Sequence, residues 1–425
     1  MKNKKILGVV FSATLIVCIV LAVNSKSDNK NKSYDSSSSL KSEYTQIYVS
    51  GTENSESSEV QSTDDDGSYI PDIQNTDAES TVSAEDFIPD DDNSQQDNQS
   101  SDNSGNYLPE DSSADNIVSS LDNTAPASES DFEYEETPDG NIKITRFTGD
   151  DKVISIPEKI NGKSVTIIGE NSFNGYINSE HCADIYAVSM PDTIKKIEKS
   201  AFANCFKLQF VKLGENMTEI DEGAFASCKV LDLVAIPDSV EKIGKQAFYD
   251  CTRLANLKLG NNLKSIGEYA FYECDSLVDI SIPDSVEELS EGAFACSDNI
   301  ESVVLSKNIS KIEDYLFYEC DNLKSVAIPE NAESIGEGAF AWTAIQNIDI
   351  PSNVSKVSEG AFFSCMNLKT ITIPETVKTI EKNAFGITQD DNNNEFAIDG
   401  VSIIGKKGSS AENYARSNNI EFKEN

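Results

Sequence analysis

Residues 236–259 read IPDSVEKIGKQAFYDCTRLANLKL, and variants of this stretch recur throughout the C-terminal part of the chain. The recurrence is clearest in its phenylalanine, which returns at Phe173, Phe202, Phe225, Phe248, Phe271, Phe294, Phe317, Phe340, Phe362 and Phe385. After a first gap of 29 residues, successive phenylalanines are separated by 22 or 23 residues. A fixed period this short indicates stacked repeats, a solenoid in which each unit contacts its neighbours.

Each repeat is predicted to contribute one short strand and one short helical turn. Val234 and Ile236 alternate with small neighbours, which is the period of a β-strand. Pro237 follows this pair and ends the strand, because proline cannot donate to a strand ladder. The Ala-Phe step of the repeat then returns the chain to the next strand. We therefore predict a β-rich solenoid in which strands one repeat apart, about 23 residues, pair in parallel.

This unit resembles the leucine-rich repeats of the BspA family, the Treponema pallidum type of repeat. The shared pattern is I-P-x-x-V-x-x-I-G-x-x-A-F-x-x-C-x-x-L, and the resemblance covers residues 131–425. Residues 137–169 resemble the family's N-terminal cap, and residues 405–422 resemble its closing segment. The resemblance implies a leucine-rich-repeat solenoid on a bacterial surface or secreted protein that functions in adhesion or protein binding.

The N-terminal part of the chain is predicted to hold two non-globular regions. Residues 1–23 place lysines before the apolar run Ile6–Val23, which as a helix at about 1.5 Å per residue would cross a bilayer core. An uncleaved anchor, a cleaved signal peptide and a lipoprotein modified at Cys18 all remain open, and each would export the remainder. Residues 24–130 are rich in Ser, Asp and Glu without apolar periodicity, which predicts a disordered acidic stalk. The rest divides into an N-terminal cap with the first repeat at 131–170, leucine-rich repeats at 171–389 and a C-terminal cap at 390–425.

The net charge and the histidine content restrict the classes of function that the chain could have. The chain has 73 acidic and 34 basic residues, a net charge of −39, which argues against nucleic acid as a partner. It has one histidine, His181, and this weighs against catalytic triads, Cys-His pairs and histidine-rich metal sites. We therefore expect a protein without catalysis, cofactor or metal.

The cysteines are predicted to form a row along the solenoid, because they follow the repeat phenylalanines. Most lie three residues after the phenylalanine, and Cys296 lies two after it. Disulfides or a row of metal ions are possible for such a row, but parallel side chains in an apolar setting favour small, inert, reduced thiols. The members are Cys205, Cys228, Cys251, Cys274, Cys296, Cys320 and Cys365.

Two other segments are candidates for chemistry. His181 and Cys182 are adjacent in an insertion, NGYINSEHCADIY, and adjacent residues seldom face each other as nucleophile and base. The stretch DDNNNEFAIDG, residues 390–400, resembles the start of a calcium loop. Glu395 stands where a calcium loop needs glycine, so we expect an acidic loop before the cap.

The best candidate binding surface is the outward face of the predicted strands. Tyr186, Phe210 and Leu233 would form an apolar patch near its N-terminal end, and Lys212 and Lys258 are outward residues of the same face. Exposed apolar patches often mark binding sites. Packing of these residues against the 175–185 insertion is the alternative.

The sequence thus favours an extracellular, surface-attached or secreted protein that binds another protein or a glycan. Two alternatives remain open. One is a structural component of the cell envelope, and the other is a glycoside hydrolase built on a carboxylate pair, which would need two carboxyl groups about 5–10 Å apart in a cleft.

Overall fold

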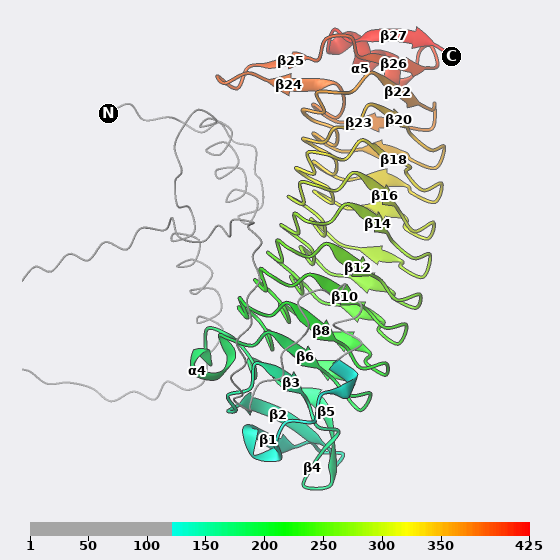
Figure 1. Ribbon diagram of the computed structural model, residues 1–425. Helices are drawn as coiled ribbons and strands as arrows, with labels where there is room; N and C mark the ends of the chain where they lie inside the picture. The colour runs from blue at the N-terminus through cyan, green and yellow to red at the C-terminus, as the bar shows by residue number, and fades with distance from the viewer. Residues whose placement is uncertain (1–120) are drawn as a thin grey trace, which may run out of the picture. The chain divides into compact units, whose positions relative to one another are not determined.

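The computed structural model describes residues 121–425 (Figure 1). The predicted membrane segment and most of the predicted stalk lie outside the described residues. Within residues 121–425 the chain winds into an elongated stack of similar turns, which confirms the predicted leucine-rich-repeat solenoid.

Two series of parallel strands run along the stack. The first series forms what we call the strand face. Its members are β3 (Val153–Ser155), β6 (Ala187–Ser189), β8 (Phe210–Lys212), β10 (Leu233–Ala235), β12 (Asn256–Lys258), β14 (Asp279–Ser281), β16 (Ser302–Val304), β18 (Ser325–Val326), β20 (Asn347–Asp349), β22 (Thr370–Ile373), β26 (Ser402–Gly405) and β27 (Glu421–Glu424). The register between neighbours is one repeat, as in Asp279 opposite Ser302.

The second series consists mostly of two-residue strands, and the sequence analysis did not predict it. Its members are β2 (Ile142–Phe147), β5 (Lys163–Ile168), β7 (Lys196–Ile197), β9 (Glu219–Ile220), β11 (Lys242–Ile243), β13 (Ser265–Ile266), β15 (Glu288–Leu289), β17 (Lys311–Ile312), β19 (Ser334–Ile335), β21 (Lys356–Val357) and β23 (Thr379–Ile380). Two antiparallel strands, β1 (Phe132–Glu136) and β4 (Lys159–Ile160), pair with β2 and β5.

The return segment of each repeat is a run of turns and not the predicted helical turn. Its backbone forms a third ladder between repeats, in which the Phe248 N–H donates to the Ala270 carbonyl at 2.8 Å. Residues in the left-handed region of the backbone, such as Tyr269 (φ 54°) and Glu273 (φ 54°), make these tight turns. This pattern satisfies backbone groups across repeats where a helix would satisfy them within one.

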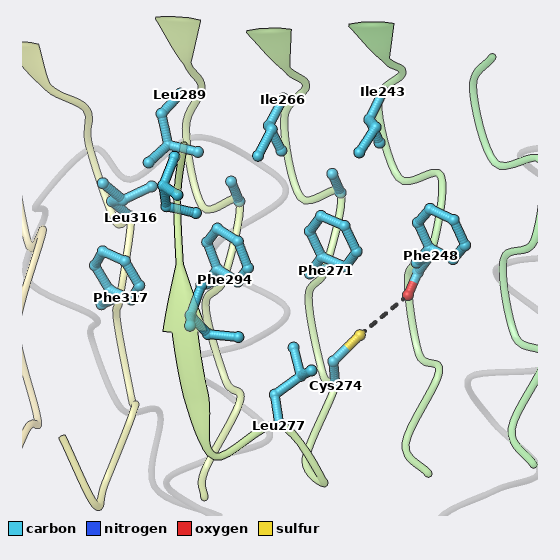
Figure 2. Close-up of a cluster of buried hydrophobic side chains, with 14 of the residues drawn as sticks. Ile243, Phe248, Ile266, Phe271, Cys274, Leu277, Leu289, Phe294, Leu316 and Phe317 are labelled. Atoms are coloured by element: carbon cyan, nitrogen blue, oxygen red, sulfur yellow. Dashed lines mark hydrogen bonds between the residues drawn. The ribbon is translucent and has the colours of Figure 1, made fainter. Parts of the chain in front are cut away.

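The core is a stack of phenylalanine rings, one from each repeat (Figure 2). The rings of Phe248 and Phe271 lie nearly parallel, with centroids 5.2 Å apart, and the Phe271–Phe294 pair repeats this separation. A branched aliphatic residue from the second strand series, such as Ile266, packs in the same core beside the rings. Because every repeat supplies the same side chain at the same place, burial is continuous along the solenoid.

The N-terminal end is closed by β1 and by residues 121–131, which we call the strap. The strap contains two single 3₁₀ turns, η2 (Leu121–Asn123) and η3 (Glu129–Asp131). The Ala127 N–H donates to the Ser155 carbonyl at 2.9 Å, on the outer edge of β3. The prediction that disorder extends to residue 130 is therefore wrong for residues 121–130, because this segment packs on the first repeats.

The C-terminal end is closed by helix α5 (Ser410–Ser417), while a hairpin of β24 (Ile387–Gln389) and β25 (Glu395–Ala397) projects from the stack (Figure 1). The buried Tyr414 hydroxyl donates to the Phe385 carbonyl at 3.0 Å and accepts from the Phe385 N–H at 2.9 Å. Helix α5 thereby supplies hydrogen-bond partners for the backbone N–H and carbonyl of Phe385, the last phenylalanine of the stack.

Candidate binding face

The strand face alternates sharply between core and solvent. Val303 is 6 % exposed, whereas its neighbour Val304 is 63 % exposed. The same exposed–buried–exposed pattern occurs in β14 and β20. The residues on either side of each core position therefore form two outward rows along the stack.

These outward rows carry little charge. Beyond the first three repeats, only Lys258, Asp279 and Asp349 are charged among the outward residues of β12 to β22. The complete set is Asn256, Lys258, Asp279, Ser281, Ser302, Val304, Ser325, Ala327, Asn347, Asp349, Thr370 and Thr372. In a chain of net charge −39, this face stands out as nearly neutral and built from small side chains.

Tyr186, Phe210 and Leu233 lie together on the strand face, but all three are buried or half-buried. Phe210 is 2 % exposed, so the expectation that it faces solvent is wrong. Its ring meets that of the half-buried Tyr186 edge-on, with centroids 5.6 Å apart. Leu121 of the strap, itself 1 % exposed, packs with Ala187 and Phe210 in a cluster separate from the main core. The cover is thus the strap and not the 175–185 insertion.

The other predicted site residues differ in exposure. Leu233 and Lys212 are half-buried, and Lys258 is exposed on β12. Leu233 lies directly beside Phe210 in the parallel register of β8 and β10. The sequence signal that was missed is Leu121, an apolar residue in the predicted stalk ten residues before the predicted cap.

The buried cysteines of the row link neighbouring repeats by hydrogen bonds. Each buried thiol donates to the carbonyl of the phenylalanine one repeat earlier, as Cys274 does to Phe248 at 3.3 Å (Figure 2). Burial raises the pKa of Cys251, Cys274 and Cys320, and it raises the pKa of Cys365 to about 11. Such thiols stay protonated at neutral pH and are poor nucleophiles, which supports the interpretation as inert core cysteines.

The assignment of Cys296 to this row is wrong. Ser297 occupies the position, fully buried, and its hydroxyl donates to the Phe271 carbonyl at 3.0 Å. Cys296 is displaced into a left-handed turn position (φ 57°) and is partly exposed. The position three residues after the phenylalanine therefore defines the row, and either cysteine or serine can occupy it.

The His181–Cys182 pair contributes to packing of the N-terminal end. The His181 Nδ1 lies 3.1 Å from the Gly149 carbonyl oxygen and 3.4 Å from the Asp150 carboxylate. Cys182 is buried in α4 (Ser179–Cys182), accepts a hydrogen bond from the Asn178 amide, and burial raises its pKa to about 12. A thiol in this state is not an activated nucleophile.

Residues 390–394 form the hairpin loop and not a calcium loop. The Asp390 carboxylate accepts from the backbone N–H groups of Asn392 and Asn394, each at 2.9 Å. The Asn394 side-chain amide donates to the other carboxylate oxygen at 2.9 Å. This bond, and then the backbone bonds, lower the pKa of Asp390, and together they use both oxygens that a cation would need. Within residues 121–425, no group of three or more His, Cys, Asp or Glu side chains is placed to hold a metal ion.

A cavity of about 380 Å³ lies beside the start of α5. Its lining includes Lys378, Lys406 and Lys407. Its single carboxylate, Glu375, is ion-paired with Lys406, and this pairing lowers the Glu375 pKa. A glycosidase needs a pair of carboxyl groups across such a cavity, so this one does not fit that chemistry. In the part of the chain that the structure describes, no helix has the length and apolarity needed to cross a membrane.

Comparison with known proteins agrees with this architecture. A leucine-rich repeat protein from Bacteroides ovatus is 25% identical, with a TM-score of 0.57, and the alignment covers 69% of this chain and 75% of that chain. The Treponema pallidum leucine-rich repeat protein is 29% identical over 51% of this chain and 89% of that chain, with a TM-score of 0.39. No curated protein matches the chain.

The family described as the BspA type leucine rich repeat region matches residues 166–300 and 287–406, in six copies. These residues include the Phe202–Phe385 ladder and its strands. The chain therefore belongs to the BspA-type leucine-rich repeat family.

Proposed function

We propose that this chain is an exported, non-catalytic binding protein that contacts an extracellular protein through its strand face. The observation that carries the proposal is the long, nearly neutral strand face on an otherwise strongly acidic chain. Small outward side chains leave this face accessible to the main chain and side chains of a partner.

The dimensions favour a macromolecular partner. Parallel strands about 4.8 Å apart give a face roughly 50 Å long, and about three residues of strand give a width of roughly 10 Å. With its flanking turns, this area approaches the roughly 800 Å² that each partner buries in a standard interface. A small ligand would instead need a concave, mostly apolar pocket.

Export is supported by the sequence and by the family. The apolar run Ile6–Val23 after the N-terminal lysines is suited to a signal peptide or a membrane anchor. Attachment to the cell surface through this segment would present the solenoid to the outside, and adhesion is the role we propose for it.

Saturable binding of immobilised full-length chain to extracellular proteins and to glycans tests the proposal. The strand-face variant carries Lys258→Glu and Val304→Asp. The matched control carries Lys407→Glu and Thr379→Asp, which change the charge equally at exposed positions away from the strand face.

We expect a protein partner that the parent and the control bind and the strand-face variant binds at least tenfold more weakly. If the parent binds a glycan and the strand-face variant loses that binding, the partner is a glycan and not a protein, while the strand face remains the binding site. Equal binding by all three chains would contradict the strand face as the site. Absence of any partner would favour a structural role in the cell envelope.

A further inference from the structure

The strap covers the N-terminal end of the strand face. Four residues beneath it, Val153, Tyr186, Ala187 and Phe210, form what we call the N-terminal patch. Ala187 and Phe210 lie opposite each other in the pairing of β6 with β8, so their side chains form one continuous apolar surface. Leu121 packs on this surface.

The patch is exceptional among equivalent positions of the solenoid. Further along the same outward row stand Asn256, Asp279 and Ser302, which are all exposed. Apolar residues appear in this row where the strap crosses it, and Leu233 continues the row one repeat beyond. The apolar surface of the patch therefore suits an aliphatic side chain, and the buried Leu121 is an example of such a side chain packed on it.

Within the strap, Ala127 packs against the main core, whereas Leu121 lies outside it. Leu121 belongs to a cluster separate from the phenylalanine stack. The Ala127 N–H donates to the Ser155 carbonyl at the edge of β3, which is the backbone contact that an added peptide strand would make. Leu121 thus covers the patch from outside the phenylalanine stack, and it can leave the patch without opening that stack.

We propose that the N-terminal patch is a docking site for a peptide segment bearing an aliphatic side chain, and that Leu121 occupies this site in cis. A partner segment of this kind would compete with the strap, and it would then contact the patch and hydrogen-bond to the edge of β3. This inference rests on the proposed function, because it makes the patch the N-terminal end of the binding face.

The probe is a fluorescein-labelled peptide of residues 121–131, LDNTAPASESD, with the same peptide carrying Leu121→Ser as its negative control. Fluorescence anisotropy measures its binding to the full-length parent and to the full-length Leu121→Ser variant. Two further chains add Ala187→Asp or Tyr186→Ala to Leu121→Ser, and a third adds Val304→Asp elsewhere on the strand face. Circular dichroism confirms that each chain is folded, and Tyr186→Ala alters only a half-buried residue.

We expect the peptide to bind the Leu121→Ser chain at least tenfold more tightly than the parent. Adding Ala187→Asp or Tyr186→Ala should remove this binding, and adding Val304→Asp should keep it. Equal binding to parent and Leu121→Ser chains, binding to neither, or binding that survives both patch substitutions would overturn the inference. Each of these failures leaves the proposed function standing if the parent still binds its partner through Lys258 and Val304.

Discussion

At the scale of single residues, one hydrogen bond explains why cysteine recurs in the repeats. The thiol fills a small buried space and donates to a carbonyl of the preceding repeat, and Ser297 shows that a hydroxyl does the same. We expect Cys274→Ser to change the free energy of unfolding by less than about 1 kcal/mol. Cys274→Ala should cost about 1–3 kcal/mol, because it removes the donor and leaves a small void. Urea denaturation measures both, and a serine variant less stable than the alanine variant would contradict this role.

Two glycines separate backbone strain from steric contact. Gly338 and Gly360 both have positive φ, at 55° and 61°. A Cβ at Gly338 would lie 2.7 Å from the Tyr315 ring, while a Cβ at Gly360 would find its nearest neighbour at 3.6 Å, an ordinary contact. We expect Gly360→Ala to cost about 1 kcal/mol of stability and Gly338→Ala about 2–4 kcal/mol. Equal losses in urea denaturation would show that the Tyr315 ring moves aside freely.

One aspartate makes stability depend on pH. Burial, and then repulsion from Asp298 and Asp250, raise the pKa of Asp275 to about 6. Because the folded pKa lies above the unfolded value near 3.8, the contribution of Asp275 to stability is complete below about pH 4 and is lost as pH rises through 6. Asp275→Asn should therefore be more stable than the parent at pH 7, by about 1 kcal/mol once solvent screening is considered, and equal to it at pH 4.

Urea midpoints at the two pH values measure this difference. Asp284→Asn is the control, because Lys307 lowers the pKa of Asp284 and its removal should give no gain at pH 7. A gain for Asp275→Asn of the same size at pH 4 and pH 7 would exclude titration of this carboxyl as the cause.

At the scale of elements, each strand of the first series separates core from binding face within one residue. Val303 and Val304 are adjacent on β16 and differ tenfold in exposure, 6 % against 63 %. We expect Val303→Ala to cost about 2–3 kcal/mol and Val304→Ala less than about 0.5 kcal/mol. Thermal unfolding of the two variants tests the alternation, and similar losses would mean that β16 does not present its residues as described.

The sequence predicted the strands better than the segments between them. Alternation at Val234 and Ile236 and the stop at Pro237 specify the strand face directly. The second strand series was missed because pairs such as Lys242–Ile243 are too short to show a period. The return segment was mistaken for a helical turn because its left-handed positions accept residues as different as Tyr269 and Cys296, so residue type gives no signal.

At the scale of the whole molecule, the solenoid is defined by how its ends are closed. Tyr414 and α5 close the C-terminal end at the last phenylalanine, and a closing segment there was predicted. The strap at the N-terminal end was not predicted, because Leu121 belongs to a short group of apolar residues, with Ile117 and Val118, that is too small to predict packing in a long polar stretch. The predicted apolar residues accordingly lie together at the N-terminal end of the strand face, but the segment that covers them is the strap and not the 175–185 insertion.

The central claim is that the strand face is the face that meets the partner. Photo-crosslinking tests it most directly, with p-benzoylphenylalanine incorporated in the full-length chain in place of Val304 on β16 or of Glu288 on β15, both exposed. The account predicts partner adducts from position 304 and none above background from position 288. Adducts from position 288 alone, or equally from both positions, would contradict it.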